Sequence, residues 1–253
     1  MARRDEILAH LDDLLTPDAF DDYGPNGLQV PGSGEVTTVV TGVTGQLELF
    51  ERAAELGAQL VIVHHGILWD FHPRRLSPLQ AGRLRVLLES DISLAAYHLP
   101  LDAHPDVGNN ALIADGLECA SREPFAEHHG QTIGFAGRFA ADGIPIADLV
   151  GRVREFTGRE PLLLGAGPDR VGSIGVVSGG AANDLTAAID AGLDAFLTGE
   201  PAEHVMAEAR EAGVHFIAAG HYATETFGVR RIGDLVAERF GVEHVFVDIP
   251  NPV

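Results

Sequence analysis

The sequence contains no lysine, so all 17 of its basic residues are arginines. This excludes Schiff-base chemistry, which needs a lysine amine, and the phosphate loop, which needs a lysine beside its glycines. Acidic residues are abundant, since 37 aspartates and glutamates give a formal net charge of −20. A field of that sign repels phosphate backbones, and no basic run interrupts it. We therefore expect no nucleic acid partner.

The missing lysine and the acidic surface have two explanations. Proteins adapted to high salt favour acidic surfaces, because screening by salt offsets the repulsion between like charges. A codon bias toward arginine is the alternative. Stability that increases with salt concentration would favour the first explanation.

Cysteine and long apolar runs are also scarce. Cys119 is the only cysteine, which excludes an internal disulfide, a thiolate zinc cluster and a Cys-x-x-Cys redox pair. No apolar run approaches the roughly 20 residues of a transmembrane helix, and the N-terminus is amphipathic from its first turn. We therefore expect a soluble, cytoplasmic protein without a membrane partner.

Helical and strand-like patterns alternate along the 253 residues. Amphipathic spacing predicts helices over residues 4–15, 46–56, 78–88, 109–115, 146–156, 183–191, 202–212 and 224–240. Short apolar runs predict strands over residues 37–43, 60–63, 92–97, 132–139, 161–164, 173–177, 195–197, 215–218 and 245–248. The alternation predicts an α/β fold of two similar lobes, each a mixed, largely parallel sheet flanked by helices. The less regular segment 120–145 suggests lobes of about 1–125 and 126–253, without an inserted middle domain.

Imidazole and carboxylate side chains follow three predicted strands at the point where each strand ends. They are His64 and His65 after strand 60–63, His98 and Asp102 after strand 92–97, and His221 and Glu225 after strand 215–218. Open α/β sheets collect ligand groups at such strand ends. Buried ionisable groups are costly unless they are paired or coordinated. The joint pattern therefore predicts a metal site.

The spacing within these stretches suggests how the site is built. Adjacent side chains of a strand point to opposite faces, so His64 and His65 can serve one site only where the strand ends, and Gly66 eases that turn. Such a pair could reach two ions, which need a separation of roughly 3.5–4 Å and bridging carboxylates. The spacing of four between His221 and Glu225 places both on one face if a helix begins there.

The remaining polar motifs are less specific. His98 could be a ligand, a proton shuttle or a partner that orients a ligand, and His104 is a weaker candidate. The pair His128-His129 has no predicted strand before it and is interpreted as a solvated loop. The other histidines considered, His72, His204, His215 and His244, are interpreted as structural. The segment 178–181 follows a strand and opens a helix, which suits either a tight turn or an anion site.

Several motifs, in order along nearly the whole chain, resemble those of the NIF3-like proteins, a group also named GTP cyclohydrolase I type 2. The matching segments are Asn26 to Val30, His64-His65-Gly66, His98 with Asp102, Ser178 to Gly180, Thr198-Gly199-Glu200, and Gly220-His221-Tyr222 with Glu225. The chain departs from the family pattern at Leu99-Pro100-Leu101, where the family usually has Thr-Asn-Leu.

The resemblance implies a specific site and assembly. It implies that His64, His65, Asp102, His221 and Glu225 hold two metal ions between two α/β lobes, and that six chains form a toroidal homohexamer. Because the ligand set has no thiolate, zinc, iron(II), manganese and nickel are all compatible.

The leading functional hypothesis is a dinuclear metal-dependent hydrolase, because a metal ion can supply hydroxide near neutral pH. His98 is the candidate proton shuttle, and Glu200 is a candidate anchor for a ligand. The family name suggests GTP as the substrate, while another phosphoester is equally compatible. Scattered arginines such as Arg74, Arg75, Arg230 and Arg231 are the available phosphate contacts. A metal-binding interaction or regulatory protein with structural metals is the alternative.

Overall fold

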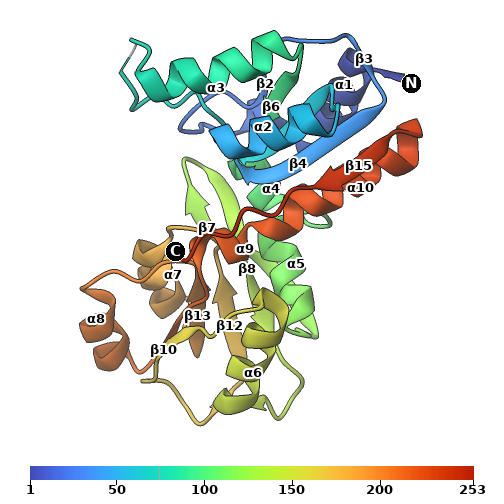
Figure 1. Cartoon of the computed structure of the whole chain (residues 1–253). Helices are drawn as coiled ribbons and strands as arrows, with labels where there is room; N and C mark the ends of the chain where they lie inside the picture. Colours follow the sequence, from blue (N-terminus) through green and yellow to red (C-terminus); the bar gives the residue numbers. More distant parts are fainter. Residues whose placement is uncertain (74) are drawn as a thin grey trace. The chain divides into compact units, whose positions relative to one another are not determined.

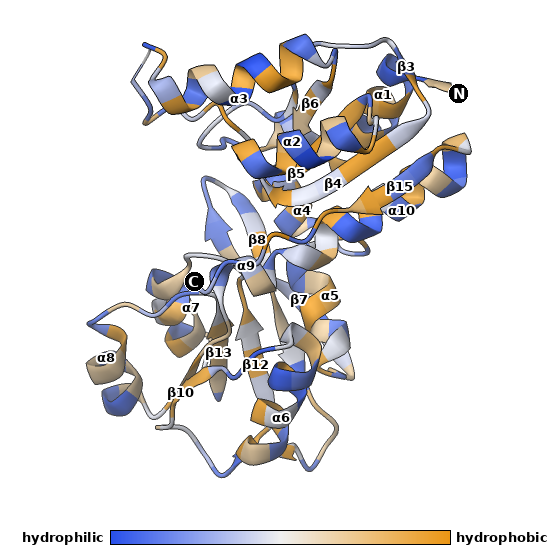
Figure 2. Ribbon diagram, viewed as in Figure 1, coloured by the Kyte–Doolittle hydropathy of each residue, from blue (hydrophilic) through white to orange (hydrophobic). Residues whose placement is uncertain are grey.

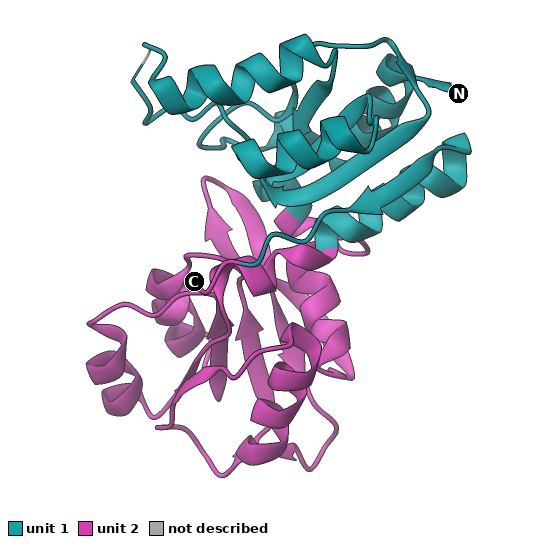
Figure 3. Cartoon of the chain, viewed as in Figure 1, with its two compact units in different colours: residues 1–101, 228–250 teal, residues 102–227, 251–253 magenta. Residues whose placement is uncertain are grey.

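The computed structural model describes residues 1–73 and 75–253, and Arg74 therefore lies outside the described residues (Figure 1). The described chain divides into two compact units (Figure 3). Unit 1 comprises residues 1–101 and 228–250, and unit 2 comprises residues 102–227 and 251–253. The predicted division near residue 125 falls inside unit 2, and a C-terminal segment returns to complete unit 1.

Unit 1 is organised around a sheet with the strand order β15-β4-β5-β6-β2. Its strands are β2 Gly27–Val30, β4 Thr38–Thr44, β5 Leu60–His65, β6 Ser93–Ala96 and β15 Glu243–Phe246. All neighbouring pairs among the described strands of this sheet are parallel except β2 with β6. The helices are α1 Arg4–Leu15, α2 Leu47–Glu55, α3 Pro78–Glu89 and most of α10 Thr226–Phe240, with a 3-10 turn at Pro17–Ala19. A short ladder pairs β1 Ala2–Arg3 with β3 Glu35–Val36.

Apolar side chains on one face of this sheet make a continuous core with α2 and α3. Val40, Val61 and Val63 of the strands pack with Phe50 of α2 and Leu87 of α3. Parallel strands that are covered on both faces read as continuous apolar runs, which explains why residues 60–63 are recognisable in the sequence. Figure 2 shows the contrast, since β4 is drawn in orange and near-white, whereas the helices mix blue hydrophilic with orange hydrophobic residues.

Unit 2 contains a mixed sheet with the strand order β10-β14-β13-β12-β8-β7. Its strands are β7 Ser121–His128, β8 Gln131–Arg138, β10 Leu162–Leu164, β12 Ser173–Val176, β13 Ala195–Thr198 and β14 His215–Ala218. Strands β12, β13 and β14 are parallel, and the others pair antiparallel. The helices are α5 Asn109–Gly116, α6 Ile146–Thr157, α7 Leu185–Asp190, α8 Val205–Ala212 and α9 His221–Thr224, with a 3-10 turn at Ala182–Asp184. A short ladder pairs β9 Ile144–Pro145 with β11 Arg170–Val171.

The sheet of unit 2 is buried on both faces. Ile113 of α5 and Leu149 of α6 pack against Ile174 and Leu197 of the central strands. Alternate residues point the other way, so Phe196 and its neighbours belong to the face that α7 and α8 cover. Both units are thus sheets flanked by helices, which confirms the predicted α/β class.

The middle of the chain differs most from the prediction. Only one strand was expected between residues 119 and 143, whereas β7 and β8 form a long antiparallel hairpin. Strand β7 reads Ser-Arg-Glu-Pro-Phe-Ala-Glu-His, with few apolar residues, because it is the edge strand and faces solvent for much of its length. The interpretation of His128 as a loop residue is wrong, since His128 ends β7. Within residues 1–73 and 75–253, no helix has the length and apolarity that a membrane span requires.

Two leucines of α2 test whether burial against the sheet stabilises unit 1. Leu49 is 1% exposed and lies over Gly42 of β4, whereas Leu47 is 41% exposed. We expect Leu49→Ala to lower the free energy of unfolding by about 2–5 kcal/mol. Leu47→Ala should change it by no more than about 0.5 kcal/mol. Urea unfolding followed by circular dichroism measures both, and equal losses would contradict the packing described.

Candidate metal centre

His64 and His65 occupy the last two positions of strand β5. The prediction ended the strand at Val63, but the ladder continues and pairs His65 with Thr44 of β4. The two imidazole centroids nevertheless lie only 4.7 Å apart, with 45° between their planes. The end of the strand therefore presents both rings to one place, as the sequence suggested, without an earlier turn.

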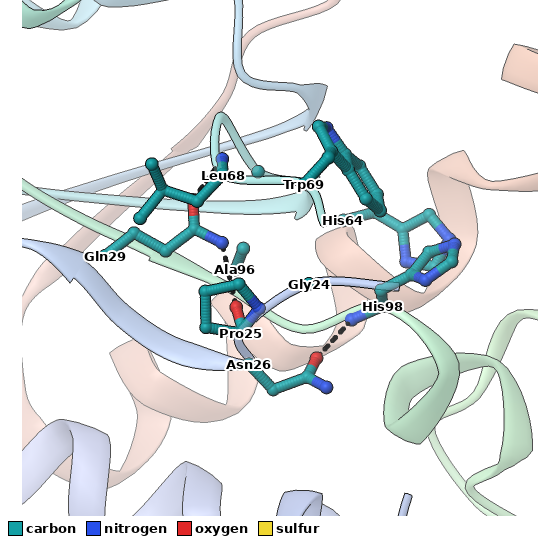
Figure 4. Close-up of a pocket in the computed structure, with 10 residues that line it drawn as sticks. Gly24, Pro25, Asn26, Gln29, His64, Leu68, Trp69, Ala96 and His98 are labelled. Atoms are coloured by element: carbon teal, nitrogen blue, oxygen red, sulfur yellow. Dashed lines mark hydrogen bonds between the residues drawn. The ribbon is translucent and has the colours of Figure 1, made fainter. Parts of the chain in front are cut away.

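His98 joins these two rings from the end of the neighbouring strand β6. Its ring centroid lies 5.0 Å from that of His64 and 5.6 Å from that of His65. One ligand atom from each of the three histidines lies within 4.8 Å of the others. Figure 4 shows His64 and His98 close together beside Trp69. Unit 1 by itself thus holds a cluster of three imidazoles that can bind a metal ion.

The Nδ1 atom of each imidazole in this cluster contacts a protein oxygen. His64 Nδ1 lies 3.0 Å from the carbonyl oxygen of Tyr97, and His65 Nδ1 lies 3.2 Å from the hydroxyl of Thr44. His98 Nδ1 lies 2.6 Å from a carboxylate oxygen of Asp22. Metal-binding histidines typically have one ring nitrogen fixed in this way, which orients the other nitrogen toward the ion.

Asp22 is the residue of this region that the sequence analysis missed. Its side chain is 2% exposed, and its second oxygen accepts hydrogen bonds from Asn26 Nδ2 at 2.9 Å and from the backbone N–H of Leu99 at 3.0 Å. Burial opposes ionisation, but the contacts with His98, Asn26 and Leu99 outweigh it and lower the pKa of Asp22. The Asn26 side chain also accepts the backbone N–H of His98 (Figure 4). Asp22 and Asn26 therefore fix the position of His98.

Asp102 lies in unit 2, on the short helix α4 Leu99–Ala103, and is 6% exposed. One carboxylate oxygen accepts hydrogen bonds from Asn109 Nδ2 at 2.8 Å and from the Ser178 hydroxyl at 3.0 Å. Ser178 is held in turn, because its backbone N–H donates to Asn110. This buried carboxylate is thus oriented by neutral donors within its own unit.

His221 and Glu225 form the other polar cluster of unit 2. The predicted one-sided arrangement is present, although α9 ends at Thr224 and Glu225 caps it. His221 Nε2 lies 3.1 Å from Glu225 Oε2, and His221 Nδ1 forms a short hydrogen bond with Glu200. Burial lowers the pKa of His221, but the two carboxylates outweigh burial and raise this pKa to about 9.

The Ser178-Gly179-Gly180 turn shapes the surroundings of Glu225. Gly179 has φ +67°, and a Cβ atom there would lie 2.3 Å from Glu225 Oε1. The backbone N–H groups of Ser178, Gly179 and Ala181 donate to side-chain oxygens of the protein. These bonds favour the tight-turn interpretation of the segment over an anion site.

Other histidines have structural contacts. His104 accepts two backbone N–H groups through Nδ1, and so does His215. His244 lies between Asp234, at 2.9 Å, and the hydroxyl of Thr41, at 2.8 Å. This order of groups resembles a hydrolytic triad, but Thr41 is fully buried and cannot reach a substrate.

Comparison with known proteins shows the family of the chain. The model of the family described as Duf34/NIF3 (NGG1p interacting factor 3) matches residues 2–252. The chain belongs to this family. The resemblance inferred from the motifs is thereby confirmed.

Curated relatives in the Duf34/NIF3 family cover nearly the whole chain. A Pseudomonas aeruginosa protein named GTP cyclohydrolase 1 type 2 homolog is 44% identical over 246 residues, which is 97% of each chain. A Vibrio cholerae protein of the same name is 38% identical over 252 residues, which is 98% of each chain.

Solved structures show the same fold. The protein ybgI, described as of unknown function, has a TM-score of 0.93 and 38% identity, and the protein TTHA1606 from Thermus thermophilus has a TM-score of 0.91 and 36% identity. Both alignments cover 100% of each chain.

The donor atoms fit a borderline divalent cation. Imidazole nitrogens and carboxylate oxygens suit zinc, iron, manganese and nickel, and the clusters described contain no thiolate. Outer hydrogen bonds of the kind that orient metal ligands are present at His64, His98 and Asp102.

The pKa of His221 predicts a pH dependence of the metal-free protein. The folded state raises this pKa from 6.5 to about 9, so the protonated ring stabilises the fold fully below pH 6.5. This contribution is lost as the pH rises toward 9. We expect the free energy of unfolding in chelator to decrease over this range, measured by urea unfolding.

The matched variants are His221→Gln, which should lose this part of the pH dependence, and His72→Gln at an exposed position, which should retain it. An unchanged pH dependence in His221→Gln would contradict the assignment.

Proposed function

We propose that the protein is a metal-dependent hydrolase in which His64, His65, Asp102, His221 and Glu225 hold two divalent ions. The observation that carries this proposal is the cluster of His64, His65 and His98, whose ligand atoms lie within 4.8 Å of one another. Three imidazoles, each with Nδ1 against a protein oxygen, are difficult to explain as core packing alone.

The position of the carboxylates in the chain supports their joint use with the histidines. Asp102 is the first residue of unit 2 and follows His98 through the short helix α4. Glu225 precedes Gly228, where the chain resumes unit 1. Along the chain, both carboxylates therefore stand within three residues of a residue of unit 1.

A bound divalent ion would supply Lewis acidity and activate water near neutral pH. The protein's own contribution is to orient the ligands and to handle protons. We assign proton transfer to His98, because Asp22 fixes its Nδ1 and thereby its tautomer and ring plane. Asp22 would also stabilise the imidazolium that forms when Nε2 takes up a proton, as a buried carboxylate does beside a catalytic histidine.

The names of the relatives make GTP the first substrate to test, and the reaction to test is the release of formate. Phosphoester hydrolysis is the second reaction to test.

Two of the arginines considered for phosphate binding have other contacts. Arg230 stacks on the Phe246 ring at 3.6 Å, and Arg231 lies 3.5 Å from Glu238. Arg75 is exposed and remains a candidate for phosphate binding. We further propose a cytoplasmic homohexamer.

The activity can be tested with the reconstituted protein in high salt. We expect zinc, iron(II), manganese or nickel to restore formate or phosphate release from GTP, measured by product assays. Glu225→Gln should abolish release because it removes a proposed ligand, whereas Glu203→Gln, at an exposed position, should not. If neither product forms while metal analysis finds about two ions per chain, GTP is not the substrate, and other phosphoesters and a binding role with structural metals become the next hypotheses to test.

His98→Asn separates the role of a proton shuttle from that of a ligand. As a shuttle, His98 contributes to the reaction without holding the ion, so the variant should keep its metal content. Product release should fall about 10²- to 10⁴-fold. His72→Asn is the control. Loss of metal from His98→Asn would show that His98 is a ligand.

A further inference from the structure

Exposed aromatic side chains are rare and lie at one place in unit 1. The sequence has 16 aromatic residues, as 12 phenylalanines, 3 tyrosines and 1 tryptophan. Among those in the described residues, Phe71 and Tyr23 are the exposed ones, at 69% and 45%. Exposed aromatic rings that adjoin a polar site commonly contact a ligand.

These two rings and Trp69 gather around His98. The Trp69 ring lies edge-on to His98, with centroids 5.2 Å apart and 90° between the planes. Phe71 stacks on Trp69 at 5.5 Å and 20°. Tyr23 meets His98 at 6.1 Å and 61°. We call Tyr23, Trp69 and Phe71 the aromatic collar.

The collar is held in place by backbone contacts. The N–H of Asp70 donates to the carbonyl of Tyr23 at 2.9 Å. A Cβ atom at Gly24 would lie 2.3 Å from the carbonyl oxygen of Leu68, so only glycine allows the two segments to approach so closely. The N–H of Ile67 donates to Gln29 at 2.9 Å. The rings therefore belong to a fixed arrangement in the folded unit.

We propose that the aromatic collar binds a planar heteroaromatic ring of the substrate, such as a purine base, beside His98. This inference rests on the proposed function and adds the place where the base of the substrate binds. Rings stack on aromatic faces regardless of the groups that bases carry for pairing. Asp21 and Asp70, both exposed next to the collar, disfavour a phosphate there, so the ring of a nucleotide is the part that fits.

The experiment uses Trp69, the only tryptophan, as its reporter. Guanosine is titrated into the metal-free protein of 253 residues with tryptophan excitation, and ribose 5-phosphate serves as the probe without a base. We expect guanosine to quench the fluorescence with saturation and ribose 5-phosphate to leave it unchanged. Phe71→Ala should weaken guanosine binding by about tenfold, because it removes a stacking partner of the base.

Leu79→Ala, at a position that is 75% exposed outside the collar, should bind guanosine as the wild type does. Equal affinities of Phe71→Ala and the wild type would overturn the inference. A second outcome would also overturn the inference. If the Trp69 fluorescence of the wild type changes with protein concentration, and Phe71→Ala loses both this change and the assembly of the chains, the collar is a contact between copies.

Metal analysis of the same preparations separates the two proposals. Guanosine binding in a protein that takes up no metal would support the collar and contradict the proposed hydrolase. Metal uptake and GTP turnover without guanosine binding would contradict the collar alone.

Discussion

The register between strands β5 and β6 is the constraint on which the histidine cluster depends. The ladder pairs Val63 with Ala96, and the N–H of Tyr97 continues it by donating to the carbonyl of Val63. The carbonyl of Tyr97 then meets His64 Nδ1. Because the side chains of a strand alternate between faces, a slip by one residue would turn His64 away and leave that carbonyl without its partner. The β-branched core of β5 therefore positions the cluster as well as stabilising the sheet.

Tyr97 also ties the first helix to this register. Its ring is fully buried, and its hydroxyl donates to Asp12 of α1 at 2.7 Å. Burial and the neighbouring Asp12 carboxylate raise the pKa of the Tyr97 hydroxyl, so it stays protonated and keeps donating. The residue whose backbone holds His64 is thus fixed at its far end by a hydrogen bond to another element. This arrangement explains how a strand end can be rigid enough to position the histidine cluster.

The sequence predicts groups that depend on local pattern and misses those that depend on long-range contacts. His64, His65 and His98 were recognisable because each follows an apolar strand, and the structure brings their rings together. Asp22 was not recognisable in this way, because it stands in a turn-rich segment. Its role depends on a contact with His98, which lies 76 residues away in the sequence. Strand β7 was missed for a similar reason, since an edge strand needs few apolar residues. No local sequence pattern predicts that α10 and β15 return to unit 1 either.

Charge supplies the last argument for a cation in unit 2. His221 lies between the carboxylates of Glu200 and Glu225, so the three groups carry a net charge of −1 even when the imidazole is protonated. Glu225 is 3% exposed, and a buried negative charge is costly in a chain that already carries −20. The chain has no lysine, so its cationic side chains are arginines and protonated histidines. A divalent cation would offset this charge locally and release the proton of His221, which supports the assignment of His221 and Glu225 as ligands.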